Sequence, residues 1–137
     1  MHLLSESAIW ATESEFTDAA GKCSIGKGES RIEVAGVRVI NTSWVEMEDG
    51  KRILNVYDIE KVQDNLYHYR STNPALGIQT GSFCIDKNIV YSKFSIIDTQ
   101  LSGFESIVRD NDICHAYGAL YDNDKLINTW TTTMQKI

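Results

Sequence analysis

Histidines at positions 2, 68 and 115 are the side chains best suited to chemistry in this chain, and no catalytic motif joins them. His115 lies among aromatic residues, and His68 lies in Tyr67-His68-Tyr69-Arg70. Either histidine could act as a base or as an axial ligand of haem. The alternative for both is a hydrogen-bonded histidine in the wall of a sheet. Their spacing forms no compact metal motif, so we predict no metal site and no cofactor, with haem held by His115 or His68 as an alternative.

Three aromatic residues combine an apolar body with one polar group, namely Tyr57, Tyr117 and Trp130. Such residues line pockets that orient mostly apolar ligands, and the alternative for them is ordinary core packing. Arg70 would bind a carboxylate ligand if it faced inward, because a buried guanidinium needs an anionic partner. The alternative is an exposed arginine near the loop that contains Pro74.

The composition limits the classes of function. A length of 137 residues predicts one domain over residues 1–137, and a formal net charge of −6 argues against binding to nucleic acid and to anionic membranes. Three widely spaced cysteines form no disulfide framework, which favours a reducing compartment. The first residues resemble no signal peptide and no apolar run is long enough for a membrane helix, so we expect a cytoplasmic protein.

Alternating segments separated by turn signals about every ten residues dominate the chain. This rhythm predicts an all-β fold, a single antiparallel up-and-down barrel of about nine or ten strands. Short helical turns are expected near residues 2–6 or 97–102. The predicted strands are 7–17, 30–35, 37–47, 51–60, 66–71, 78–86, 89–95, 103–110, 113–121 and 126–134.

Two-residue hairpin turns, if present, determine which side chains share a face, and a slip of one residue inverts every face. An Asp49-Gly50 turn pairs Trp44 with Asn55 and Thr42 with Tyr57. An Asn123-Asp124 turn pairs Tyr117 with Trp130. Turns at Lys87-Asn88 and Asn111-Asp112 determine in the same way which side chains of their flanking strands share a face. These turns predict a packed wall of Phe83, Ile85, Val90 and Phe94, an inward face with Phe104, Val108, His115, Tyr117 and Trp130, and an opposite face with Glu105, Ala116, Gly118, Thr129 and Thr131.

The strand rhythm and size resemble the calycin superfamily, which contains lipocalin-like and fatty-acid-binding-protein-like barrels. Ala8-Ile9-Trp10 keeps the tryptophan of the first lipocalin strand without its usual glycine. The segment 17–28 is too short and too rich in glycine for the helical lid of fatty-acid-binding proteins. The resemblance, which extends to small bacterial proteins of this architecture, implies a barrel with an internal cavity and leaves its ligand open.

The leading functional hypothesis is a protein that binds a small, mostly apolar molecule inside the barrel. One alternative is a lipocalin-like isomerase, cyclase or decarboxylase that acts on an apolar carboxylic acid or phenol through Tyr57, Tyr117, His115 or Arg70. Others are a haem-binding barrel and a structural domain that forms a homodimer through a Thr-rich outer face. The predicted ligand-binding residues are Trp44, Tyr57, Arg70, Phe104, His115, Tyr117 and Trp130.

Overall fold

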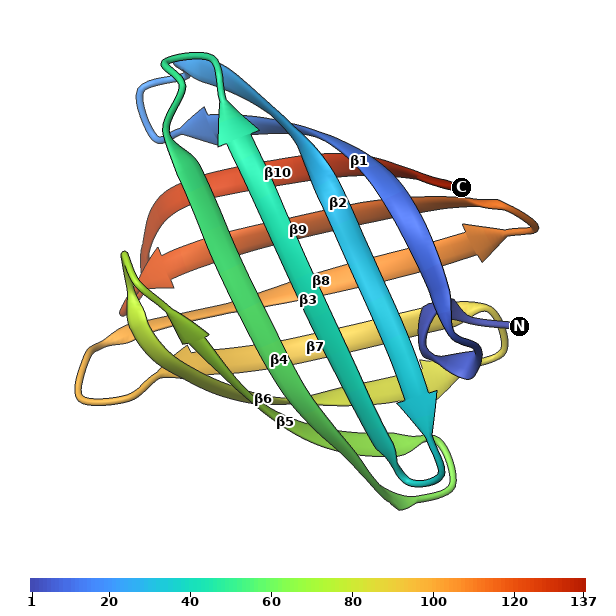
Figure 1. Cartoon of the computed structure of the whole chain (residues 1–137). Coiled ribbons are helices and arrows are strands. Elements are labelled where there is room, and N and C mark those ends of the chain that lie inside the picture. The colour runs from blue at the N-terminus through green and yellow to red at the C-terminus, as the bar shows by residue number, and fades with distance from the viewer.

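A computed structural model describes all residues from Met1 to Ile137. It contains one short helix, the 3₁₀ helix η1 (Leu3–Ser5), followed by ten strands that run across the wall of a barrel (Figure 1). No helix in the structure is long and apolar enough to cross a membrane. The strands are β1 (Ala8–Asp18), β2 (Cys23–Ala35), β3 (Arg38–Met47), β4 (Arg52–Gln63), β5 (Leu66–Asn73), β6 (Gly77–Asp86), β7 (Ile89–Ile96), β8 (Leu101–Asp110), β9 (Ile113–Asp122) and β10 (Lys125–Lys136).

The sheet closes on itself. Each strand pairs antiparallel with the next along the chain, and β1 pairs with β10 from Trp10–Lys136 to Asp18–Asn128. The sheet therefore has no free edge that could pair with another chain. The predicted fold class, an all-β antiparallel up-and-down barrel, is confirmed. The predicted helical turn near residues 2–6 is also present as η1.

Tight turns with left-handed residues separate most strands of the C-terminal half. Lys87, Asn111 and Asn123 have φ angles of 57°, 55° and 52°. Two-residue hairpins need such backbone angles, because they match the right-handed twist of the paired strands. The Lys87-Asn88 turn pairs Ile85 with Val90, and the Asn111-Asp112 turn pairs Val108 with His115, as predicted.

Alternation along each strand separates the core from the outer surface. Trp10 and Val90 are 0% exposed, and Ile32, Val39 and Ile59 are almost as deeply buried. Phe83, Val90 and Phe94 are buried in one apolar cluster with Ile85 packed against it, so the predicted wall is confirmed. Removing large apolar surfaces from water is the main favourable contribution to stability here.

Two predicted registers are wrong by one residue. Between β3 and β4, the Met47 N–H donates to Lys51 O at 2.8 Å, and Gly50 has a φ of 84°, so the loop holds three residues. Trp44 consequently pairs with Leu54, and Tyr57 pairs with Asn41. In β10, a bulge at Ile127 shifts the pairing, so that Trp130 lies opposite Gly118 and not opposite Tyr117.

The β10 bulge reverses part of the predicted inward face. Phe104 and Tyr117 are 52% and 50% exposed, and His115 is also exposed, so these side chains lie outside the barrel. Ala116 and Glu105, which were expected outside, line its interior. The bulge puts Trp130 and Tyr117 on opposite faces, and because Trp130 lies inside, the predicted faces of β8 and β9 are the ones that are reversed. Thr129 and Thr131 lie outside, as predicted.

A short N-terminal segment closes one end of the barrel. Leu3 and Leu4 of η1 are 4% and 3% exposed, and the segment is held by the carboxylate of Glu6. Glu6 Oε1 accepts hydrogen bonds from the Arg109 guanidinium at 2.6 Å and from Lys136 Nζ at 2.8 Å. Arg109 is buried and also donates to Asn111 O at 2.8 Å. One carboxylate thus joins the N-terminal segment to β8 and β10.

We predict that Glu6→Gln destabilises the fold at neutral pH and much less in acid. Hydrogen bonds from Lys136 and Arg109 lower the pKa of Glu6 to about 2. A depressed carboxyl pKa contributes stability above the unfolded value near 4.5, and this contribution disappears as the pH falls toward 2. Thermal unfolding should show a lower midpoint for Glu6→Gln at pH 7 and nearly equal midpoints at pH 2. Equal midpoints at pH 7 would contradict the role of Glu6.

Candidate ligand cavity

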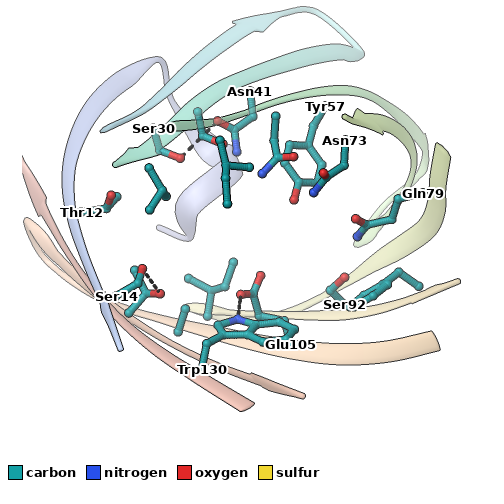
Figure 2. Close-up of a pocket in the computed structure, with 18 of the residues that line it drawn as sticks. Thr12, Ser14, Ser30, Asn41, Tyr57, Asn73, Gln79, Ser92, Glu105 and Trp130 are labelled. Carbon is teal, nitrogen blue, oxygen red and sulfur yellow. Dashed lines mark hydrogen bonds between the residues drawn. The ribbon is translucent and has the colours of Figure 1, made fainter. Parts of the chain in front are cut away.

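A cavity of about 530 Å³ lies inside the barrel. It extends from Leu3 and Leu4 at the closed end to Met47 and the β5–β6 loop residues Ala75 and Leu76 at the other. Figure 2 shows side chains from opposite walls pointing into this space. Its polar lining residues include Thr12, Ser14, Ser30, Asn41, Ser43, Asn55, Tyr57, Asn73, Gln79, Ser92, Glu105, Asn128, Trp130 and Thr132.

The charge of the lining has one sign. No lysine, arginine or histidine is among the lining residues, whereas Glu29 and Glu105 are. Glu105 is an inward-facing residue of β8, and its strand partners are Ser92 of β7 and Gly118 of β9. A carboxylate in this position has no basic side chain of the lining to compensate its charge.

Glu105 receives one hydrogen bond, from the indole of Trp130. Trp130 Nε1 donates to Glu105 Oε2 at 2.6 Å, and the dashed line in Figure 2 marks this bond. The two residues are two strands apart, on β10 and β8, with Gly118 of β9 between them. A Cβ atom at Gly118 would lie 2.3 Å from the indole ring. The missing side chain therefore lets the ring lie across β9 and reach Glu105.

Burial changes the acidity of three groups in the cavity. Desolvation raises the pKa of Glu105, and the hydrogen bond from Trp130 offsets part of this effect. Desolvation also raises the pKa of Tyr57, to which the negative charge of Glu105 adds. The pKa of Tyr69 is raised by desolvation in the same way. The surroundings of these groups thus disfavour their ionised forms.

A small hydrogen-bond network positions Tyr69 beside Tyr57. Gln79 Nε2 donates to the Tyr69 hydroxyl at 3.0 Å, and the Ser92 hydroxyl lies 3.4 Å from the same oxygen. The rings of Tyr57 and Tyr69 are 5.5 Å apart between centroids, and Tyr69 stacks on Phe83 at 4.4 Å. Neighbouring rings restrict how far these two tyrosines can move, which keeps their hydroxyl groups in place.

Two other acceptors of the lining lack a partner. Asn55 Oδ1 and Asn128 Oδ1 are buried and accept no hydrogen bond. Buried polar atoms without a partner are uncommon in folded proteins because each one costs free energy. Two side chains of the lining thus each hold a covered acceptor atom at a cost in stability.

The structure brings together three of the seven predicted ligand-binding residues. Trp44, Tyr57 and Trp130 belong to the lining. The guanidinium carbon of Arg52 lies 3.9 Å from the centroid of the Trp44 ring. Trp44 therefore borders the cavity while its ring packs against a surface arginine. Ligand binding by the three residues stays a prediction.

The other four predicted residues lie outside the cavity. Phe104, His115 and Tyr117 are exposed because of the register described above. Arg70 is exposed on the outer face of the sheet, where it lies opposite Asp58 in the β4–β5 register. His68 is exposed as well, so neither histidine proposed as a haem ligand reaches the interior. No group of three His, Cys, Asp or Glu side chains is placed to hold a metal ion.

Glu105 is the functional candidate that the sequence analysis placed on the wrong face. One signal could have located it. The correctly predicted wall puts Val90 and Phe94 of β7 inside, which also puts Ser92 inside. Ser92 pairs with Glu105. The register between β7 and β8 depends on the length of the turn within the polar segment 97–102, and the sequence does not reveal that length.

No protein-family model and no curated protein sequence matches this chain. Solved structures do match its shape. Rv2717c from M. tuberculosis superposes with a TM-score of 0.75 and 10% identity, covering 96% of this chain and 92% of that one. A DUF3598-family protein of unknown function from Nostoc punctiforme matches with a TM-score of 0.65 and 9% identity, over 96% of this chain and 47% of that one.

A third match has a bound molecule. The structure of EF1p2_mFAP2b bound to DFHBI superposes with a TM-score of 0.53 and 14% identity, covering 96% of this chain and 93% of that one. At these identities the likenesses show the fold alone, a closed antiparallel barrel.

We predict that Gly118→Ala breaks the hydrogen bond between Trp130 and Glu105. The new Cβ would collide with the indole ring, which must move, and such overpacking costs about 1–3 kcal/mol. The indole N–H resonance of Trp130 in an NMR spectrum should shift. Gly81→Ala is the matched control, since its Cβ would lie 2.8 Å from the Tyr69 ring and 2.4 Å from Lys93 O and meets no atom of Trp130. An unchanged Trp130 resonance in Gly118→Ala, or the same shift in both variants, would contradict this geometry.

We predict that Glu105→Gln stabilises the protein more at pH 7 than at pH 4. The glutamine can still accept the Trp130 hydrogen bond but carries no charge. A carboxyl whose pKa is raised on folding lowers stability as the pH rises from its unfolded value through its folded value. Urea unfolding at both pH values measures this difference. An exposed control, Glu13→Gln, should show no such gain, and equal effects of Glu105→Gln at both pH values would refute the prediction.

Proposed function

We propose that this protein binds a small, mostly apolar molecule inside its barrel. The observation that carries the proposal is the cavity itself, which has about 530 Å³ of space within a closed sheet. Twenty of its 34 lining residues are hydrophobic, which suits a ligand with an apolar body. Sites for small molecules generally combine such a lining with a few polar groups that orient the ligand.

The comparison with EF1p2_mFAP2b supports this proposal, because a barrel of similar shape is bound to DFHBI there.

We also propose that the chain forms one calycin-type domain over residues 1–137. The support is that strands from Ala8 to Lys136 all belong to one closed sheet.

An enzyme on this barrel has less support. Of the four residues put forward for proton transfer and carboxylate binding, Tyr57 faces the cavity, whereas Arg70, His115 and Tyr117 are exposed. The cavity also contains no basic side chain that would hold the carboxylate of a substrate. An apolar carboxylic acid is therefore a poor ligand for this site, since its charge would be buried without a partner.

We predict that Ser43→Phe lowers the affinity for Nile red at least ten-fold. Ser43 lines the cavity, so a benzyl group there would occupy space that the dye needs. Thr42→Phe adds the same group to the exposed face of the same strand and should leave the affinity unchanged. Fluorescence titration measures both affinities, and native mass spectrometry reports whether one dye binds per chain. No uptake of Nile red by the unmodified protein, or equal loss in both variants, would overturn the proposed function.

A further inference from the structure

Glu105 has no counter-ion within reach, which makes it unlike Arg109, the buried charge of the same strand. Arg109 points inward on the same strand and is paired with Glu6 at the closed end. Arg109 lies four positions after Glu105, or about 13 Å along a strand, and buried Ile107 lies between them. The charges that face Glu105 are those of the lining, and none is positive. A cation that pairs with Glu105 must therefore come from outside the chain.

The carboxylate of Glu105 also keeps one acceptor atom free. Glu105 Oε2 accepts the hydrogen bond from Trp130 Nε1, whereas Glu105 Oε1 accepts no hydrogen bond from the protein. Asn128 Oδ1, two residues from Trp130 on β10, is a buried acceptor without a donor, and so is Asn55 Oδ1. Glu105 Oε1 is thus free to accept a hydrogen bond from a group that carries several N–H bonds, whereas the two asparagine oxygens are covered by the protein. An ammonium group carries three and accepts none.

Aromatic rings surround this space. Tyr57 points toward Glu105 from the opposite wall in Figure 2, and the rings of Trp130, Tyr69 and Phe94 line the same cavity. The faces of aromatic rings attract cations and do not attract anions. The formal net charge of −6 adds a long-range attraction for cations and a repulsion for anions.

We propose that the ligand of this cavity carries a protonated amine on an apolar body, and that Glu105 is its counter-ion. This inference rests on the proposed function, because it names the class of molecule that the cavity selects. A neutral molecule of the same shape leaves the carboxylate without a counter-ion. An anionic molecule brings a second negative charge beside it. Only the amine gives Glu105 a counter-ion, so charge determines the selectivity.

Three compounds with one naphthalene body and different charge test this inference. They are naphthalen-2-ylmethylamine, naphthalen-2-ylmethanol and naphthalen-2-ylacetic acid, each used at pH 7 to displace Nile red and in direct calorimetric titration. We expect the amine to bind at least ten-fold more tightly than the alcohol, and the acid to bind most weakly. This comparison uses the unmodified protein and does not depend on the folding of any variant.

Two matched variants then assign the selectivity to Glu105. Glu105→Gln should reduce the preference for the amine over the alcohol to less than about two-fold. Glu13→Gln, which removes the same charge from the exposed face of β1, should keep the full preference. Circular dichroism establishes that both variants are folded.

The outcomes separate the two proposals. If Nile red binds but the amine is no better than the alcohol, or if Glu105→Gln keeps the preference, the amine inference is wrong and the binding function stands. The same conclusion follows if the acid binds most tightly. If neither Nile red nor any naphthalene compound binds, the proposed function fails together with the inference.

Discussion

The pairing of β1 with β10 is the constraint on which the rest of the structure depends. It joins the two ends of the chain from Trp10–Lys136 to Asp18–Asn128, and the Ile137 N–H extends it by donating to Ile9 O at 2.9 Å. Closure removes both sheet edges and gives every strand one inner and one outer face. The N-terminal segment and β10 also meet at the closed end, where Glu6 accepts a hydrogen bond from Lys136. An open sheet would hold neither the end closure nor the cavity.

The interior is shaped by pairs of glycine and aromatic residues on neighbouring strands. Gly81 pairs with Tyr69, Gly103 with Phe94 and Gly118 with Trp130. A Cβ on any of these glycines would come within 3 Å of the partner ring, so each ring lies over a glycine and against the wall. Aromatic rings cover the glycine positions of the sheet in this way and supply apolar contact. The centre of the barrel stays open as a result, and Glu105 faces it at a cost in stability. Natural proteins accept such costs mainly at functional sites.

Much of the fold was predictable from local patterns, whereas the site was not. The ten strands and the turns at Lys87-Asn88 and Asn111-Asp112 follow from alternation and turn chemistry, which involve neighbouring residues only. The bulge at Ile127 and the three-residue loop before Lys51 left no clear local signal. Each shifts one register by a single residue, and with a period of two this reverses the face of a whole strand segment. Phe104, His115 and Tyr117 were therefore placed inside and Glu105 outside.

The sequence by itself determined the class of fold, the strand number to within one and the negative charge of the chain, because alternation, turn residues and composition are local or additive properties. The tertiary structure decided which side chains share the cavity. Trp130, Gly118 and Glu105 lie on three different strands, and their contact depends on two registers and on the closure of the sheet. A one-residue offset costs little locally but changes every long-range contact. The chemistry of the interior therefore exists only in the folded barrel.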